Sequence, residues 1–239
     1  MIQYERQQAI LHYLEEHSPA AIKDIARQIY TSEASVRRDV RAMEEKGLVR
    51  KIYGGVLLSD RKNAIIPLDL RDGEHAAAKD AVAKMAAETV FDGATVYLDA
   101  SSTVWRMLKY LRGYKGLKII TNNLRIFSET ESFEGTIYCT GGTYDPKNRS
   151  FYGPGAARFV ESVSVDLFFF SSQGITEDGE ISDPAETETA LRQAVLKRAG
   201  RSYFLCDSSK IGRRNLFTVC HKNDLDGIFC DTKLPWETD

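Results

Sequence analysis

The sequence predicts an α/β protein in which a small helical domain precedes a larger domain with a mainly parallel β-sheet. Residues 5–46 carry apolar side chains at helical spacing, whereas the chain from Glu74 onward alternates helical patterns with short apolar runs. Such alternation is typical of a parallel sheet with helices on both faces. A length of 239 residues accommodates a small module and one further domain of ordinary size.

The first two helices are predicted from the spacing of their apolar residues. Residues 5–16 place Ile10, Leu11 and Leu14 on one face. A second stripe follows at positions i, i+3, i+4 and i+7, which share one face of a helix. It consists of Ile22, Ile25, Ala26 and Ile29. Together these faces supply most of a small hydrophobic core.

The third helix, predicted over residues 33–46, suits DNA recognition. Ser32 can cap it by accepting a hydrogen bond from a backbone N–H group, and Gly47 can end it in a left-handed conformation. The apolar residues at i, i+4 and i+7 are Val36, Val40 and Met43. The polar residues left on the remaining surface are Ser35, Arg37, Arg38 and Arg41. Two short helices joined by a tight turn, with cations on the second, are typical of a helix-turn-helix that enters a major groove.

A short basic hairpin follows this helix. Residues 48–56 alternate roughly between apolar and polar side chains, and Tyr53, Gly54 and Gly55 offer a turn. Arg50 and Lys51 can then face phosphates. Residues 1–58 are therefore predicted to form a winged helix-turn-helix domain.

Charge supports this interpretation locally but not globally. Residues 1–58 hold nine Lys and Arg against eight Asp and Glu, whereas residues 36–51 alone hold six cations against three anions. Positive charge in that place can neutralise phosphates while the rest of the chain repels DNA, since the whole chain has a net charge of −2. Two alternatives are an ordinary solvated helix with three arginines and a winged helix that binds another protein.

The chain between the two domains lacks periodicity. Residues 59–63 are polar, and Pro67 discourages a continuous helix. We therefore predict a linker over residues 59–73 and a second domain over residues 74–239.

The elements of the second domain are predicted from the same two periodicities. Strands are expected at residues 95–98, 117–120, 136–139, 165–170, 202–206, 216–220 and 227–230. Helices are expected from Glu74 to about Thr89 and over residues 102–111, 124–131 and 186–199. In doubly wound, Rossmann-like sheets of this kind, ligands bind beyond the carboxyl ends of the strands.

Small polar residues follow the first strand of the predicted sheet. Asp99, Ser101, Ser102 and Thr103 open the next helix, where backbone N–H groups and the helix dipole favour an anion. This segment can serve as a phosphate cradle. It can equally be a simple helix cap, and the residues by themselves favour neither role.

Three further strand ends carry polar or flexible residues. Thr121 and Asn122 end the second strand, and Gly141 and Gly142 follow the third. Lys210 follows a later strand and brings an ammonium group that can bind phosphate or sugar hydroxyls. Four such loops on one sheet edge indicate a ligand site better than any one of them. Weaker candidates, which better fit surface or packing positions, are Arg149, Tyr152 and Glu188.

Several classes of protein are not favoured by the sequence. The four cysteines form no CxxC pair and the four histidines form no ligand spacing, so we expect neither a metal site nor a cofactor. No apolar run approaches the ~20 residues of a membrane span, and no signal-peptide pattern is present. We expect a cytoplasmic protein with no membrane partner.

The segment SEASVRRDVRAMEEKGLVRKIYGG, residues 32–55, resembles the N-terminal signature of the DeoR family of bacterial repressors. That signature is a capped helix of the form S-x-x-[TS]-[IV]-R-R-D that leads through a glycine into a wing ending in two glycines. The resemblance implies that Ser35, Arg37 and Arg38 face DNA. It also implies that Asp39 orients an arginine.

The second domain resembles the effector domain of the same family, through LDASST, TNN, GG, FFFSSQGITEDG, ETETALRQAVLKRA and CDSSK in that order. That domain is similar in fold to ribose-5-phosphate isomerase, so the resemblance implies a sensor of a phosphorylated sugar or polyol. The implied ligand residues are Asp99, Ser101, Ser102, Thr103, Thr121, Asn122, Gly141, Gly142 and Lys210, and Glu188 and Lys79 match less specific positions. The isomerase's glycine-rich segment has no counterpart at residues 184–188, and its acidic loop is replaced by Ser171–Ile175.

The expected function is therefore regulation of transcription rather than catalysis. We expect a homodimer or homotetramer that represses a sugar or polyol catabolic operon by binding double-stranded operator DNA, and that releases it when the effector binds. The alternative is a sugar-phosphate isomerase-like enzyme fused to a DNA-binding module. No carboxylate base for proton abstraction is evident in the sequence, which favours a protein that is not an enzyme.

Overall fold

The computed structural model describes residues 2–59, 68–130 and 133–237. The chain divides into two compact units, Met1–Glu74 and His75–Asp239. Part of the predicted linker, residues 60–67, lies outside the described residues. Residues 68–73, for which the sequence predicted no regular element, form a short helix, α4 (Leu68–Gly73). Leu68 is fully buried, so an apolar side chain anchors the start of this helix.

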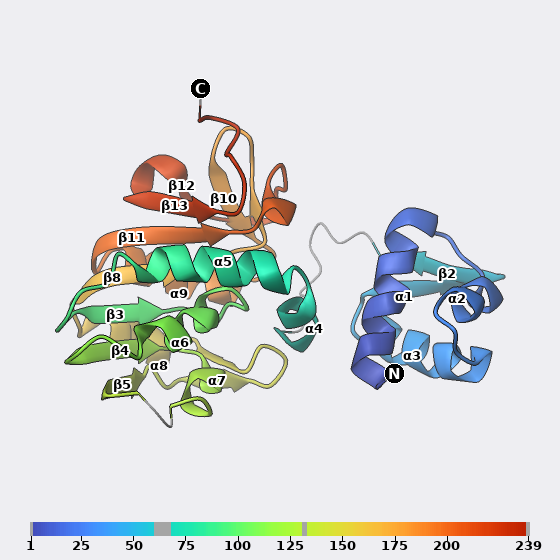
Figure 1. Ribbon diagram of the computed structural model, residues 1–239, viewed down its shortest axis with the longest axis horizontal. Coiled ribbons are helices and arrows are strands. Elements are labelled where there is room, and N and C mark those ends of the chain that lie inside the picture. The colour runs from blue at the N-terminus through green and yellow to red at the C-terminus, as the bar shows by residue number, and fades with distance from the viewer. Residues whose placement is uncertain (1, 60–67, 131–132, 238–239) are drawn as a thin grey trace. The chain divides into compact units, whose positions relative to one another are not determined.

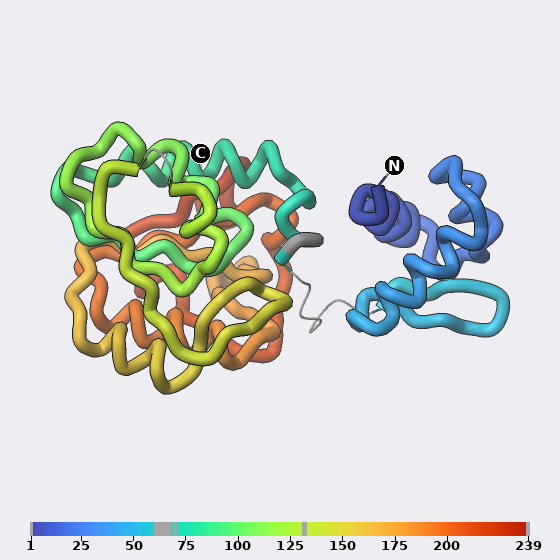
Figure 2. Tube along the Cα trace, turned by 90° about the horizontal axis from the view of Figure 1, so that it is seen from below, coloured from blue at the N-terminus to red at the C-terminus, as the bar shows by residue number. Residues whose placement is uncertain are grey.

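The N-terminal unit contains, before α4, three helices and a β-hairpin (Figure 2). These elements are α1 (Gln3–His17), α2 (Ile22–Gln28), α3 (Glu33–Glu45), β1 (Val49–Ile52) and β2 (Gly55–Leu58). Val36, Val40 and Met43 are fully buried in the core between the helices, as their spacing predicted. Ile22 of the second predicted stripe is only partly buried.

Two adjacent glycines shape the hairpin for different reasons. Ile52 pairs with Gly55, which leaves Tyr53 and Gly54 as a two-residue turn, and Gly54 has a φ of +87° that side chains other than glycine rarely adopt. A Cβ atom on Gly55 would lie 2.6 Å from the carbonyl oxygen of Ala20. Val56 and Ala20 exchange two backbone hydrogen bonds of 2.8 and 2.9 Å, which fix the hairpin to the segment between α1 and α2.

The C-terminal unit is built on a six-stranded sheet in which every neighbouring pair of strands is parallel (Figure 1). The strands are β3 (Thr95–Leu98), β4 (Leu117–Thr121), β5 (Gly135–Cys139), β8 (Val165–Phe170), β11 (Ala199–Cys206) and β13 (Gly227–Cys230). Their order across the sheet is β13-β11-β8-β3-β4-β5. The chain thus winds outward in one direction from β3 and in the other from β8, so the topological switch point lies between these two strands.

Helices cover both faces of this sheet, which makes three layers (Figure 1). One face packs against α5 (Ala76–Ala87), the 3₁₀ helix η2 (Val104–Met107), α6 (Leu108–Leu111) and α7 (Leu124–Phe127). The other face packs against α8 (Pro154–Glu161), α9 (Glu186–Leu196) and part of a smaller sheet. Strand β8 is buried almost throughout, because its side chains enter both cores in alternation.

Several elements differ from the sequence-based expectation. The predicted strand at residues 216–220 is β12 (Phe217–His221), but it pairs antiparallel with β10 (Glu180–Asp183) in the smaller sheet, which β9 (Gly174–Ile175) completes. Helix α8 and the hairpin of β6 (Thr143–Asp145) and β7 (Ser150–Tyr152) were not predicted. These segments are too short to show a period, and residue spacing does not reveal which sheet a strand joins.

Three predicted helices are shorter than expected. The one predicted over residues 186–199 is α9, which ends at Leu196, and Ala199 already belongs to β11. The helix expected from Ser102 begins only at Val104, because the Ser101 Oγ atom accepts a hydrogen bond of 3.0 Å from the Val104 backbone N–H group. The helix expected over residues 124–131 ends at Phe127, and residue 131 lies outside the described residues. The remaining short 3₁₀ helices are η3 (Ser208–Lys210) and η4 (Lys222–Asp224).

Candidate nucleic-acid interface and effector site

The N-terminus of α3 is organised by two serines. The Ser32 Oγ atom accepts a hydrogen bond of 3.2 Å from the Ser35 backbone N–H group and lies 3.0 Å from the Ser35 Oγ atom. Arg38 donates from Nη2 to the same Ser35 Oγ atom at 3.4 Å. Ser32 therefore caps the helix as predicted, and Ser35 and Arg38 lie side by side on its exposed surface.

The other predicted DNA-contacting arginines of α3 form only exposed ion pairs. Arg37 Nη2 lies 2.8 Å from Glu33 Oε2, and Arg41 Nε lies 3.6 Å from Glu45 Oε1. Both are i, i+4 pairs, and the Arg37 side chain is 62% exposed. Exposed pairs contribute at most about 1 kcal/mol, so these guanidinium groups can exchange their carboxylate partners for phosphates with little loss of stability.

The hairpin is attached to α3 through Glu44. The Glu44 Oε1 atom accepts a hydrogen bond of 2.7 Å from the Lys51 backbone N–H group, and Lys51 Nζ lies 3.1 Å from Glu44 Oε2. The backbone hydrogen bond is the main reason that the pKa of Glu44 is lowered. Arg50 and Tyr53 are exposed on the same hairpin. The hairpin therefore presents its cations at a fixed place beside the recognition helix.

Asp39 orients an arginine, but one that sequence reasoning did not single out. It is 1% exposed and faces Arg6 of α1, with distances of 2.5 Å from Nε to Oδ2 and 3.2 Å from Nη2 to Oδ1. This bidentate pair ties the first helix to the recognition helix. Arg6 and Asp39 are 33 residues apart, so no local pattern relates them.

The predicted effector residues lie where the topology places a ligand site. The loops after β3 and β8 are adjacent at the carboxyl edge of the sheet, on either side of the switch point. Asp99 Oδ1 accepts a hydrogen bond of 3.0 Å from the Ser101 N–H group, and its Oδ2 accepts one of 3.2 Å from the Ser171 N–H group. Ser102 and Thr103 are also buried in this loop. Asp99 thus fixes both loops in place.

Lys210 brings a third loop to the same point. Its Nζ atom lies 2.6 Å from Ser171 Oγ, 3.4 Å from Thr103 Oγ1 and 3.2 Å from Asp207 Oδ2. These partners follow β8, β3 and β11 respectively. The single ammonium group therefore joins the loops of three neighbouring strands, which a helix cap after β3 does not require.

Asp207 is ionised in this environment. Burial raises its pKa, but the positive charge of Lys210, a hydrogen bond from Ser209 and the charge of Lys79 lower it by more, so that the pKa lies well below its usual range. Lys79 is buried as well, at 4% exposure, on the α5 side of the sheet. The weakly matching Lys79 therefore belongs to the same electrostatic environment as Lys210.

The side chains of Thr121 and Asn122 form hydrogen bonds with backbone groups of neighbouring segments. Thr121 Oγ1 donates to the Leu98 carbonyl at 2.7 Å and accepts from the Asn123 N–H group at 3.0 Å. Asn122 Nδ2 donates to the Phe151 carbonyl at 3.1 Å, which ties the end of β4 to the β6–β7 hairpin. The Asn122 Oδ1 atom is buried without a partner among the described residues.

The two glycines after β5 differ in their surroundings. Both have positive φ values, +64° for Gly141 and +105° for Gly142. A Cβ atom on Gly142 would lie 2.5 Å from the Tyr152 carbonyl oxygen and 3.0 Å from the Ala156 nitrogen, whereas one on Gly141 would meet nothing within 4 Å. Gly142 therefore permits close approach of the β7–α8 connection, and only Gly141 has open space beside it.

The site also contains a buried arginine that sequence reasoning missed. Arg192 of α9 donates from Nε to Asp99 Oδ2 and from Nη1 to Asp183 Oδ2, both at 3.0 Å, and its Nη2 lies 3.6 Å from Glu188 Oε2. The only local signal is the i, i+4 spacing of Glu188 and Arg192 on the face that carries buried Leu191.

The sequence analysis placed Glu188 at a surface or packing position. In the structure, Glu188 is instead part of this cluster. It is 9% exposed and accepts a hydrogen bond of 2.9 Å from Ser150 Oγ. Burial raises its pKa, an effect that the neighbouring Arg192 opposes. Asp99, which the sequence predicted as an effector residue, contacts both Arg192 and the Ser171 backbone.

Comparison with known proteins agrees with this two-part arrangement. Residues 6–62 match the DeoR-like helix-turn-helix domain, and residues 74–232 match the DeoR C terminal sensor domain. The chain belongs to the DeoR family. We therefore refer to α1–α3 with the β1–β2 hairpin as its DNA-binding domain, and to the C-terminal unit as its sensor domain.

Two relatives in the DeoR family match nearly the whole chain. The transcriptional repressor AccR of Agrobacterium fabrum is 30% identical over 95% of this chain and 89% of its own length. The L-fucose operon activator of Haemophilus influenzae is 28% identical over 96% of this chain and 92% of its own. Among solved structures, ribose 5-phosphate isomerase A of Methanocaldococcus jannaschii matches 59% of this chain and 56% of its own at 15% identity, with a TM-score of 0.43.

The described part of this DeoR-family chain adds two observations. No described helix has both the length and the apolar character needed to cross a membrane. Within the same residues, no group of three or more His, Cys, Asp or Glu side chains is arranged to hold a metal ion. The carboxylates of Asp99, Asp183 and Glu188 face the Arg192 guanidinium group.

Proposed function

We propose that this DeoR-family chain is a cytoplasmic repressor of a sugar or polyol catabolic operon, controlled by a phosphorylated sugar or polyol. The observation that supports it best is the convergence of three strand-end loops on Lys210 at the switch point. The ammonium group lies beside the hydroxyls of Ser171 and Thr103 and the carboxylate of Asp207. An ammonium group with hydroxyls beside it suits a phosphate ester. The exposed cations of α3 supply a separate surface for the phosphates of DNA.

We assign contact with double-stranded operator DNA to the exposed polar residues of α3 and its hairpin. They are Ser32, Ser35, Arg37, Arg38, Arg41, Arg50 and Lys51. The N-terminal part of a recognition helix reaches base edges, whereas a basic hairpin contacts phosphates. Specific binding then rests on a few cations held in register by a homodimer or homotetramer on repeated half-sites.

This assignment is tested with a DNA duplex selected by the wild-type protein from a random pool. Arg37→Ala and Arg38→Ala should each weaken binding roughly ten- to hundred-fold, with a shallower dependence on salt where the arginine contacts a phosphate. Arg158→Ala, which removes an exposed cation of α8, serves as the matched control and should change nothing. Unchanged affinity and salt slope in both α3 variants would favour the protein-binding winged helix instead.

We assign the effector site to the strand-end loops of the sensor domain. Its residues are Asp99, Ser101, Ser102, Thr103, Thr121, Asn122, Gly141, Gly142 and Lys210. Binding of the effector releases DNA only if it favours the arrangement that does not bind the operator. Lys210→Ala and Asp99→Ala should abolish release while operator binding persists. Release that persists in both variants would contradict the assignment.

We further propose that the chain is not an enzyme. The loop after β8 reads Ser171-Ser172-Gln173 and offers hydroxyl and amide groups rather than a carboxylate base. A purified protein incubated with pentose and hexose phosphates should show no isomer formation above the uncatalysed rate. Turnover at ordinary enzymatic rates would favour the isomerase-like alternative.

A further inference from the structure

A narrow pocket, which as its side chains stand has no room for a water molecule, lies beside the predicted effector loops, on the face of the sheet covered by α9. Its lining residues are Tyr97, Asp99, Asn122, Glu188, Leu191 and Arg192. We call it the Arg192 pocket. It shares Asp99 with the loop that Lys210 contacts through Ser171 and Thr103. A ligand that binds at Lys210 therefore reaches this pocket when the side chains that line it move apart.

The Arg192 pocket carries an excess of negative charge. One guanidinium group faces three carboxylates, those of Asp99, Asp183 and Glu188. Tyr97 experiences the same field: burial raises the pKa of its hydroxyl, and the charges of Asp99 and Glu188 raise it further. Because the interior screens charge weakly, a further anion brought into this pocket would meet net repulsion.

Two polar atoms of the pocket have no hydrogen-bond partner among the described residues. They are the Tyr97 hydroxyl and the Asn122 Oδ1 atom, and each residue is only 1% exposed. Buried polar atoms are nearly always paired, so these two are available to a molecule that enters the pocket. A hydroxyl or amino group on that molecule can donate to Asn122 Oδ1 and to the carboxylates, and a hydroxyl can also accept from Tyr97.

The Lys210 end has the opposite character. It holds two ammonium groups, those of Lys210 and Lys79, against the single carboxylate of Asp207, together with hydroxyls from Ser171 and Thr103. The whole site is therefore polarised, with an end suited to an anion and an end suited to neutral or cationic groups.

We propose that the Arg192 pocket binds the end of the effector remote from its phosphate, accepts hydroxyl or amino groups there and rejects a second anionic group. This inference rests on the proposed function of the same site. It narrows the effector class to monophosphates of sugars, polyols or amino sugars, and excludes sugar bisphosphates and phosphorylated sugar acids. Tyr97 and Asn122 supply the recognition, and the three carboxylates supply the rejection.

Two matched pairs of ligands test the proposal by isothermal titration of the full-length protein. Glucitol 6-phosphate and 6-phosphogluconate differ only in a terminal hydroxymethyl or carboxylate group, and ribitol 5-phosphate and 5-phosphoribonate differ in the same way. Within the pair that binds, the alcohol should bind about ten-fold or more tightly than the acid. Equal or tighter binding of the acid would overturn this inference and leave the proposed function standing. No binding by any monophosphate of a wider sugar and polyol panel would overturn both.

Two variants connect the discrimination to the pocket. Glu188→Gln should reduce the ratio of alcohol to acid affinity several-fold, because it removes one of the repelling charges. Tyr97→Phe should weaken binding of the alcohol several-fold without lowering thermal stability, because the hydroxyl it removes has no partner among the described residues. Tyr110→Phe is the matched control, since that hydroxyl binds Asp80 on the other face of the sheet, and should leave affinity unchanged. An unaltered affinity ratio in Glu188→Gln together with full affinity in Tyr97→Phe would contradict the assignment.

Discussion

The two candidate sites of this chain use charge in opposite ways. The cations of α3 are exposed and pair with carboxylates one helical turn away, as Arg37 does with Glu33. Arg192 is buried and pairs with carboxylates from separate segments, including Asp99, which lies 93 residues away in the chain. An exposed local pair can be exchanged for a new partner at little loss, whereas a buried network depends on every member. The first arrangement suits a surface that binds DNA, and the second suits a site that must hold one shape until a ligand enters.

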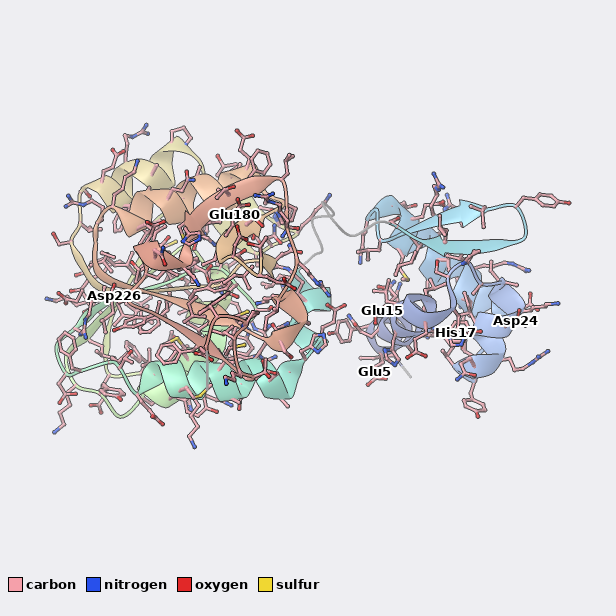
Figure 3. All side chains as sticks on the ribbon, turned by 90° about the horizontal axis from the view of Figure 1, so that it is seen from above. Glu5, Glu15, His17, Asp24, Glu180 and Asp226 are labelled. Atoms are coloured by element: carbon pink, nitrogen blue, oxygen red, sulfur yellow. The ribbon has the colours of Figure 1, made fainter. Side chains whose placement is uncertain are left out.

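The largest difference between the two regions should appear when an arginine is removed. Arg192→Met should lower the free energy of unfolding of the sensor domain by about 3–5 kcal/mol, because three buried carboxylates lose their partner. Urea denaturation followed by circular dichroism measures this. Arg214→Ala is the control. The Arg214 side chain is 67% exposed and pairs with Glu180, which is labelled in Figure 3. Its removal should change the free energy of unfolding by less than about 1 kcal/mol. Similar small losses in both variants would mean that burial does not distinguish the two kinds of pair.

The ion pair of Arg6 and Asp39 does not fit the contrast between an exposed and a buried region, because it is a buried ion pair within the DNA-binding domain. Asp39→Ala should destabilise that domain by about 2–3 kcal/mol and weaken operator binding, because α1 no longer holds α3. Arg41→Ala, which breaks only an exposed pair, should leave thermal stability unchanged within about 0.5 kcal/mol. If Asp39→Ala proves equally harmless by thermal denaturation, burial of an ion pair does not by itself make the pair important for stability.

Two glycines, one in each domain, allow a comparison of the two regions that does not involve charged side chains. Gly142→Ala should destabilise the sensor domain by about 2 kcal/mol, because a positive φ and a Cβ atom 2.5 Å from the Tyr152 oxygen both oppose it. Gly54→Ala in the hairpin should lower the free energy of unfolding of the DNA-binding domain by only about 1 kcal/mol, since its added Cβ atom meets nothing within 4 Å. Chemical denaturation of both variants gives the two values. A larger loss for Gly54→Ala would contradict the steric argument.

The smallest expected effect concerns pH. The folded-state pKa of Asp207 is lowered, so its ionised form stabilises the sensor domain above the unfolded-state pKa of about 3.9 and this contribution disappears as the pH falls below it. Asp207→Asn should therefore reduce the loss of stability between pH 6 and acidic pH. Thermal denaturation across that range measures the difference. The same pH dependence in wild type and variant would show that other groups dominate.

The sequence predicted the DNA-binding domain in more detail than the sensor site for a physical reason. Ser32, Val36 and Arg38 act within one helix, so their spacing carries the information. The sheet was predicted from alternating periods, but pairing is long-range, and β12 was therefore assigned to the wrong sheet. Arg192 could not be found because its partners come together only after the sheet has formed. Lys210 could be proposed from the sequence because its loop follows a strand, β11.

The Arg6–Asp39 pair also bears on how such regulators can be recombined. Both members lie in the first 39 residues, and the hydrophobic core around them is drawn from residues 4–58. The residues that stabilise the DNA-binding domain thus lie within its own stretch of the sequence. We expect a chimera joined after residue 58 to retain operator choice while taking its chemical signal from another family member, provided that position 6 keeps an arginine.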